Sequence, residues 1–180
     1  PNISVTFRAE NTEKALEELR AYNAEIGIVG SLSPGSDMEI LSLGATPITA
    51  FAARGTPFCA RSSLSLQDLA TLPLIFREQG SKTRQKLEEW AKRNGVKLTP
   101  AIVAEGREAV REIVASGAGI GFVSQAEYGH DNRLMQIALL DADIEMGETL
   151  VHLAQRRDVR VIRAFMDFAR KTQKGKNAGV

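Results

Sequence analysis

The sequence predicts an α/β fold of two lobes, and two observations lead to this prediction. First, strand-like alternation and helical spacing of apolar residues follow one another in residues 3–53 and again in residues 74–123. Second, a further strand and helix come after the second block, so the chain returns to the first. Because strands separated by helices run parallel, we expect two parallel-type sheets flanked by helices and joined by two crossover segments.

The first block begins with residues 3–7, in which apolar residues alternate with Ser and Thr as in a strand with one buried face. A helix follows, with Asn11 or Thr12 as its N-cap candidate. Residues 26–29 form a short apolar strand, and residues 48–53 a second extended segment. We place the first lobe boundary after residue 53.

The second block repeats this alternation with different residues. The expected strands are residues 74–76, 101–104, 120–123, 134–140 and 149–154. The expected helices carry their apolar stripes on Leu87, Trp90 and Ala91, then on Ala109, Val110, Ile113 and Val114, and finally on Val161, Ile162, Phe165 and Phe168. The alternation therefore extends over most of the chain, and a polar tail, residues 171–180, closes it.

Composition narrows the class of protein. The 180 residues include 23 Lys and Arg against 22 Asp and Glu, a formal net charge of +1, so no basic footprint favours nucleic-acid binding by this chain alone. A single cysteine, Cys59, cannot form an internal disulfide, and no apolar run approaches the roughly 20 residues of a membrane span. We therefore expect a cytoplasmic protein with no membrane partner.

The segment LIFREQGSKTRQKLEEW, residues 74–90, carries the strongest indication of a binding site. Gly80 permits a sharp turn, and Ser81 can cap the following helix while its hydroxyl and that of Thr83 face outward. A helix N-terminus attracts anions, and Lys82 adds positive charge. The turn predicts an anion site, although ordinary capping without a ligand explains the same residues.

Other polar residues also follow expected strands or start expected helices. Asn11 and Thr12, with Gly30 and Ser31, occupy such positions in the first lobe, and Ser124 follows the strand at 120–123. Since ligands of open parallel sheets bind beyond the carboxyl ends of the strands, these residues can reach a shared cleft. Turn and cap roles remain the alternative for each of them.

The sequence motifs typical of catalytic, metal-binding and cofactor-binding sites are incomplete here or occur in the wrong context. The GxGxG of residues 117–121 follows a helix and precedes a strand, the reverse of a dinucleotide site. The acidic residues 141–147 have their glycine one place late for a calcium loop. His130, His152 and Cys59 lack metal-ligand spacing, and no GxSxG elbow is present. We expect no catalytic residue, no metal and no cofactor.

Five segments, taken in order, resemble the effector-binding domain of LysR-type transcriptional regulators. They are ENTEKALEELRAYNAEIGIV, ITAFAARGTPF, LSLQDLATLPLIFREQGSKTRQKLEEW, AEGREAVREIVASGAGIGFVSQAE and VRVIRAFMDFARK. The resemblance implies a periplasmic-binding-protein-like fold of type 2. Lobe one of the effector-binding domain would be residues 1–53 plus 148–180, and lobe two residues 54–147.

The resemblance also implies a function. A small effector, often an anion, would bind between the lobes and alter how a homodimer or tetramer holds promoter DNA. The implied pocket residues are Asn11, Thr12, Gly30, Ser31, Gln79, Gly80, Ser81, Lys82, Thr83 and Ser124. The family's N-terminal helix-turn-helix is absent from this sequence, so DNA would be bound only through that other domain.

The family's first strand and helix of lobe one are absent as well. In the family's sheet order that strand lies between residues 3–7 and residues 26–29. We therefore expect these two segments to run parallel without being hydrogen-bonded neighbours.

Two other functions remain open at this stage. A solute-binding protein of a transport system has the same fold, and only the residues upstream of Pro1 would separate it from a regulator. An enzyme on this fold is the third possibility, and a turnover assay would reveal it.

Overall fold

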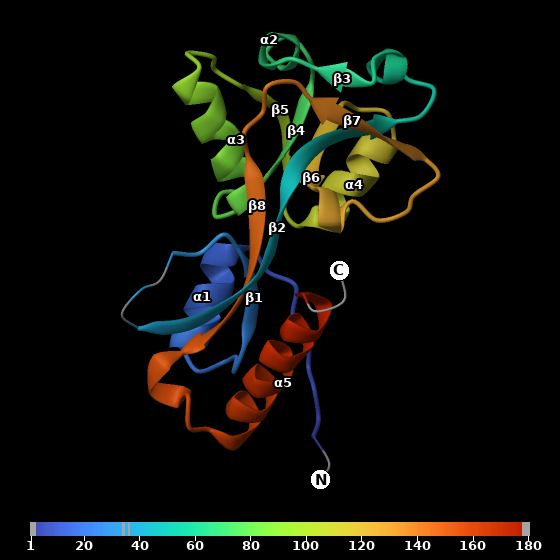
Figure 1. Ribbon diagram of the computed structural model, residues 1–180. Coiled ribbons are helices and arrows are strands. Elements are labelled where there is room, and N and C mark those ends of the chain that lie inside the picture. The colour runs from blue at the N-terminus through green and yellow to red at the C-terminus, as the bar shows by residue number, and fades with distance from the viewer. Residues whose placement is uncertain (1–2, 34, 36, 178–180) are drawn as a thin grey trace.

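The structure is a computed structural model that describes residues 3–33, 35 and 37–177. Figure 1 shows two masses of helices and strands, one above the other, joined by two long strands. These strands are β2, Met38–Ala53, and β8, Glu145–Leu153. We refer to the mass that contains α1, Thr12–Arg20, and α5, Arg160–Asn177, as lobe one and to the other as lobe two.

Antiparallel pairing of β2 with β8 connects the lobes. The register runs from Met38 opposite Leu153 to Pro47 opposite Glu145, with one irregularity between Ser42 and Gly44. From Ile48 onward, β2 pairs with strands of lobe two instead. The pairing partner of β2 therefore changes at residue 48, within one continuous strand. The lobe boundary after residue 53 stays a prediction.

Lobe one is built on the outer halves of these two strands. It adds α1, Thr12–Arg20, β1, Gly27–Gly30, the short helical turn η3, Ala154–Arg156, and α5, Arg160–Asn177. β1 pairs antiparallel with β8, which gives the order β1-β8-β2. One side of this sheet packs against Leu19 of α1, and the other against Ile162 and Met166 of α5, all buried. Burial of these apolar faces is what holds both helices on the sheet.

Lobe two contains the remaining elements. They are η1, Pro57–Ala60, β3, Ser63–Leu64, α2, Leu66–Leu69, β4, Leu74–Arg77, α3, Lys82–Arg93, β5, Pro100–Ala104, α4, Arg107–Ala115, β6, Ile120–Ser124, η2, Gln125–Glu127, and β7, Leu134–Leu139. β4 pairs parallel with β5 and with β6, as expected for strands joined by helices. Trp90 of α3 and Val114 of α4 lie buried in two separate clusters, so the two helices cover opposite faces of the sheet.

Residues 3–7 do not form the strand that their alternation predicts. Ile3, Val5 and Phe7 are 65%, 66% and 90% exposed, and the segment has no regular structure. It is not hydrogen-bonded to β1, as expected, but lobe one is antiparallel throughout its described strands rather than parallel. The physical reason is that a strand forms only against a hydrogen-bonding partner, and alternation alone supplies none.

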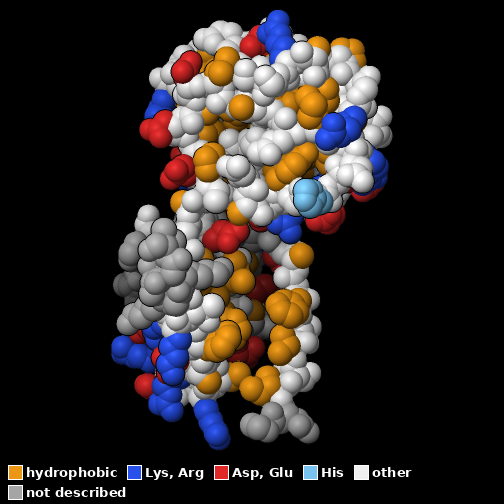
Figure 2. Space-filling view, turned by 45° about the vertical axis from the view of Figure 1, so that its right-hand side comes forward, with side chains coloured by type: hydrophobic (Ala, Val, Ile, Leu, Met, Phe, Trp, Pro, Cys, Tyr) orange, Lys and Arg blue, Asp and Glu red, His pale blue; other side chains and the backbone are white. Residues whose placement is uncertain are grey.

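Lobe one accordingly exposes several large apolar side chains. Figure 2 shows hydrophobic side chains on both sides of a hollow in this lobe. The exposed large apolar residues of lobe one include Ile3, Val5, Phe7, Ile28, Val161, Phe165 and Phe168. α5 thus buries a narrower stripe than the sequence predicted, because Ile162 and Met166 face the sheet while Phe165 and Phe168 do not. None of the helices in the described ranges has the length and apolar character needed to cross a membrane.

The parallel sheet of lobe two depends on a close approach at Gly119. A Cβ at this position would lie 2.2 Å from the carbonyl oxygen of Pro73, which accepts the hydrogen bond of the Ile120 amide. We predict that Gly119→Ala lowers the free energy of unfolding by about 1 to 3 kcal/mol, because the strands must shift apart. Urea unfolding measures this, with Ala118→Ser as the control that adds one atom at an exposed neighbour. Equal stability of both variants and wild type would contradict the packing described.

Candidate functional site

The N-terminus of α1 and the end of β1 form one side of the candidate site. Thr12, 8% exposed, accepts a hydrogen bond through Oγ1 from the amide of Gly30, at 3.1 Å. This bond joins the first residue of α1 to the last residue of β1. The bond holds two of the residues predicted from the sequence in contact, although they are 18 positions apart in the chain.

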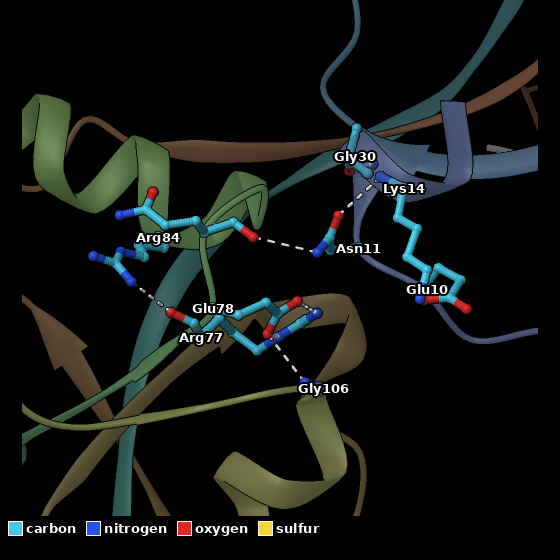
Figure 3. A network of polar contacts seen from close by, with 10 residues as sticks. Glu10, Asn11, Lys14, Gly30, Arg77, Glu78, Arg84 and Gly106 are labelled. Carbon is cyan, nitrogen blue, oxygen red and sulfur yellow. Dashed lines mark hydrogen bonds and ion pairs between the residues drawn. The ribbon is translucent and has the colours of Figure 1, made fainter. Parts of the chain in front are cut away.

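Asn11 connects the two lobes. Its Oδ1 accepts a hydrogen bond from the Lys14 amide at 3.0 Å, so the side chain is the N-cap of α1. Its Nδ2 donates to the carbonyl oxygen of Gln79, between β4 and α3, at 3.3 Å. Figure 3 shows this side chain between the two lobes. A single amide therefore both starts a helix of lobe one and contacts lobe two.

Two glycines bring the backbones of the lobes close together. A Cβ on Gly30 would lie 3.0 Å from Cβ of Lys82 and 2.9 Å from Sδ of Met146. A Cβ on Gly80 would lie 2.9 Å from Oδ1 of Asn11 and 2.7 Å from Oε2 of Glu13. Gly80 also has φ of +84°, which disfavours any other residue. The lobes are in direct contact at both positions.

Ser31 fixes the site to the crossover strand β8. Its Oγ accepts a hydrogen bond from the Gly147 amide at 2.8 Å, and its own amide donates to the Gly147 carbonyl at 2.8 Å. The hydroxyl is thus already engaged with the backbone. Ser31 acts here as a positioning residue for Gly30 and the end of β1.

An ion pair holds the turn that leads to α3. Arg77 donates two hydrogen bonds to the carboxylate of Glu78, at 2.9 and 2.7 Å, and both side chains are less than one-fifth exposed. Oε2 of Glu78 also accepts a hydrogen bond from the amide of Gly106 at 3.0 Å, as Figure 3 shows. Burial by itself raises the pKa of Glu78, but hydrogen bonds from Arg77 and from the backbone amides of Glu78 and Gly106 outweigh it and lower the pKa to about 2.

The N-terminus of α3 lacks the partners that usually neutralise a helix start. Ser81 is the N-cap residue, yet its side chain makes no cap hydrogen bond although Ser81 is only 4% exposed. The first turn contains no acidic residue. This differs from the capping role that the sequence predicted for Ser81. Free amides and a helix dipole without an acidic residue in the first turn are features that favour an anion at a helix start.

The basic side chains of α3 are partly engaged elsewhere. Nζ of Lys82 donates to Oε1 of Gln85 at 2.7 Å, with the stem of Lys82 against Gly30. Arg84 pairs with Glu88 at 2.8 Å, donates to the Arg77 carbonyl, and lies over the Phe76 ring. Thr83 lies half-buried in the first turn. Lys82 and Arg84 therefore already have partners within the protein.

The structure brings nine of the ten sequence-predicted residues together around this lobe contact. Ser124 differs, because it is fully buried and its hydroxyl donates to Glu127 at 2.9 Å. Sequence reasoning missed Glu13, Met146 and Glu78. Glu13 has the ordinary acidic character of a first helical turn, and only the tertiary structure places it against Gly80.

Elsewhere on lobe two, a surface depression of about 520 Å³ lies at the start of α4. Arg107 pairs with Glu127 at 2.5 Å, and Arg111 donates to the Tyr128 carbonyl, so both guanidinium groups are already engaged. No group of three or more His, Cys, Asp and Glu residues suited to a metal ion occurs in the part of the chain that was described.

Comparison with known protein families assigns the chain. A family model described as the LysR substrate binding domain matches residues 1–174. The chain belongs to this family. It is 28% identical over 143 residues to the HTH-type transcriptional activator CmpR of Synechocystis sp. (strain ATCC 27184 / PCC 6803 / Kazusa), covering 79% of this chain and 47% of CmpR. It is 25% identical over 140 residues to the HTH-type transcriptional regulator CysL of Bacillus subtilis (strain 168), covering 78% of this chain and 47% of CysL. The chain thus spans about half the length of these relatives.

Solved structures share the fold of this LysR substrate-binding domain. The effector binding domain of QuiR, solved in complex with shikimate, matches with a TM-score of 0.78 at 20% identity, over 92% of this chain and 79% of that one. The regulatory domain of CcmR from Synechocystis PCC6803, in complex with 2-PG, matches with a TM-score of 0.75 at 21% identity, over 91% and 80%. The fold is therefore the periplasmic-binding-protein fold of type 2, as expected from the sequence.

The pKa of Glu78 implies a defined dependence of stability on pH. Because the folded-state pKa of about 2 lies below the ordinary 4.5, this carboxylate stabilises the fold fully above pH 4.5 and loses its contribution as the pH falls toward 2. We predict that Glu78→Gln lowers the free energy of unfolding at pH 7 by about 1 to 3 kcal/mol, and that the difference from wild type shrinks below pH 4.5. Urea unfolding at several pH values measures both quantities. Glu108→Gln, at a carboxylate 77% exposed, is the control. A difference that stays constant down to pH 3 would contradict this account.

Proposed function

We propose that this chain is the effector-sensing domain of a LysR-type transcriptional regulator and that a small anionic metabolite binds between its lobes. The observation that carries the proposal is the contact between the α1 and α3 N-termini, where Asn11 donates to the Gln79 carbonyl and Ser81 is buried without a cap bond. An anion at α3 would receive hydrogen bonds from the free amides and from the hydroxyls of Ser81 and Thr83.

Binding would act on the equilibrium between lobe arrangements. A ligand that contacts both α1 and α3 stabilises the closed arrangement relative to any open one, and so shifts the population toward it. In an open arrangement, the protein would lose the Asn11–Gln79 hydrogen bond and the packing of Gly30 against Lys82. In a longer protein, this change would reach promoter DNA through a helix-turn-helix domain outside this chain.

The relatives support regulation over transport and catalysis. CmpR and CysL are both named as transcriptional regulators, and neighbours of known structure include the LysR-family regulator CbnR in complex with its target DNA. A role in solute transport finds no such support. The relatives likewise point to a non-enzymatic protein whose ligand leaves unchanged.

Removing either hydroxyl at the start of α3 tests the proposed site. We predict that Thr83→Ala and Ser81→Ala each weaken binding of an anion about tenfold, since each removes one charge-assisted hydrogen bond. Isothermal titration calorimetry with 2-phosphoglycolate, shikimate and inorganic phosphate measures this. Because Ser81 makes no side-chain cap bond, melting temperatures should change little.

Thr99→Ala is the matched control, a hydroxyl removed from an exposed loop. If an anion that binds wild type also binds Thr83→Ala and Ser81→Ala with wild-type affinity, the site is elsewhere and the turn is only structural.

Self-association is the second expectation that follows from a regulator of this family. The proposal includes a homodimer or tetramer, and lobe one exposes apolar side chains such as Phe165 and Phe168 that association could cover. Analytical ultracentrifugation at micromolar concentration should therefore show a species heavier than one 19.6-kDa chain. Sedimentation as a monomer at every concentration up to 100 micromolar would count against assembly through this chain.

A further inference from the structure

One edge of β1 has no strand beside it among the described residues. β1 pairs with β8 on its other side and stands at the end of the sheet order. The Gly30 amide already donates to Thr12, so the open part of this edge ends at Val29. Ile28 is 64% exposed here, and a strand added at this edge would therefore bind backbone groups and cover apolar surface.

Residues 3–7 have the sequence of a strand but no ladder partner in the described structure. Apolar residues at positions 3, 5 and 7 alternate with Ser and Thr, and all three apolar side chains are exposed. The segment is attached to its own lobe through Arg8, which pairs with Glu18 of α1 at 2.9 Å. Residues 8–10 are exposed and irregular, so they can serve as a hinge.

The two faces of β1 decide how an added strand would lie. Val29 packs in the cluster of α1, whereas Ile26, just before β1, packs with Ile162 and Met166 of α5. Because alternate residues of a strand point to opposite faces, Ile28 lies on the α5 face. An apolar strand face added here would therefore lie on the side of the sheet that α5 covers, in the lobe where Figure 2 shows hydrophobic side chains around a hollow.

An antiparallel register with Val5 opposite Ile28 fits both patterns. It keeps all three apolar residues of the segment on the α5 face, whereas a shift by one residue would turn them to the α1 face. It also places Arg8 opposite Glu25, a carboxylate that is 54% exposed and lies 3.7 Å from Arg156. Charge and apolar period thus favour the same register.

We propose that residues 3–7 of one copy add as an antiparallel strand to the β1 edge of a second copy, and that the exchange is reciprocal. The second copy is the occupant because the unpaired strand and the unpaired edge are both parts of this chain. The same surface then serves in both copies, as a closed two-fold dimer requires. This inference rests on the self-association proposed above and does not involve the lobe contact.

Cysteine pairs test the register. In a Cys59→Ser background, one preparation carries Val5→Cys and a second carries Ile28→Cys, and the two are mixed in equal amounts, equilibrated and oxidised. On a non-reducing gel, we expect a band at twice 19.6 kDa from the mixture and from neither preparation alone, because Val5 of one copy faces Ile28 of the other. Ser4→Cys mixed with Ile28→Cys is the matched control, one residue away on the opposite strand face, and should give little dimer.

Sedimentation measures whether the apolar strand face holds the dimer. We expect Val5→Asp to raise the dimer dissociation constant about tenfold or more, because a carboxylate would be buried beside Ile28. Val103→Asp is the matched control, since this valine of the edge strand β5 is 51% exposed, and it should change the constant by less than about twofold. Melting temperatures should match wild type for Val5→Asp, since Val5 is exposed in an irregular segment.

The outcomes separate strand exchange from its alternatives. A dimer that links only in the Val5→Cys and Ile28→Cys mixture and that Val5→Asp weakens supports the proposal. If the double variant links only within one chain and the mixture gives no dimer, residues 3–7 close on their own β1 and the proposal is overturned. Equal linking by Ser4→Cys, or a dimer that Val5→Asp leaves unchanged, overturns it as well.

The same measurements keep this inference apart from the proposed function. A dimer that persists in Val5→Asp leaves the proposed assembly standing while strand exchange fails. Sedimentation as a monomer overturns both the assembly and the exchange. Thr83→Ala reports on the anion site alone, because Thr83 lies in α3 of lobe two and not in either exchanging segment.

Discussion

The antiparallel pairing of β2 with β8 is the constraint on which the rest of the structure depends. β2 is one continuous strand of 16 residues. At one end it pairs with β8, and at the other end it pairs with β6 and β7. Both lobes are therefore built on one strand pair, and the backbone hydrogen bonds between β2 and β8 connect them. The irregularity between Ser42 and Gly44, where Gly44 has φ of +140°, bends β2 as it leaves lobe one.

These strands position the residues at the lobe contact. Met146 and Gly147 of β8 contact Gly30 and Ser31, so the end of β1 is held against the crossover rather than against a loop. On the other side, Glu78 joins the end of β4 to the start of α4 through Gly106. The turn at Gly80 is thereby positioned by two rigid elements. The contacts between the two sides include one hydrogen bond from Asn11 and close packing at Gly30 and Gly80.

Many helices and strands could be predicted from patterns in the sequence. The helix from Lys82 to Arg93 ends at Asn94 and Gly95 as its composition predicts, and its Leu87, Trp90 and Ala91 are buried. The strands at residues 74–76 and 120–123 appear within one residue or two of their expected ends. These elements were predictable because capping and apolar periodicity act over a few residues.

Other expectations failed where a distant partner decides the outcome. Residues 3–7 have a strand's alternation but no ladder partner among the described residues. Phe165 and Phe168 have helical spacing, yet they remain 47% and 68% exposed. In the same way, Ser81 has a capping side chain, yet it makes no cap bond once it is buried at the lobe contact.

The sequence by itself determined most of the alternation of strands and helices and indicated the family. It also predicted residues such as Asn11, Gly30 and Gly80 that meet at the lobe contact, because turn chemistry and helix starts are local properties. Only the tertiary structure decided that β2 runs unbroken through both lobes, that Glu78 connects the turn before α3 to the start of α4, and that Glu13 faces Gly80. The physical reason is distance along the chain. Glu13 and Gly80 are 67 positions apart, and no periodicity within either segment encodes which backbone the other will meet.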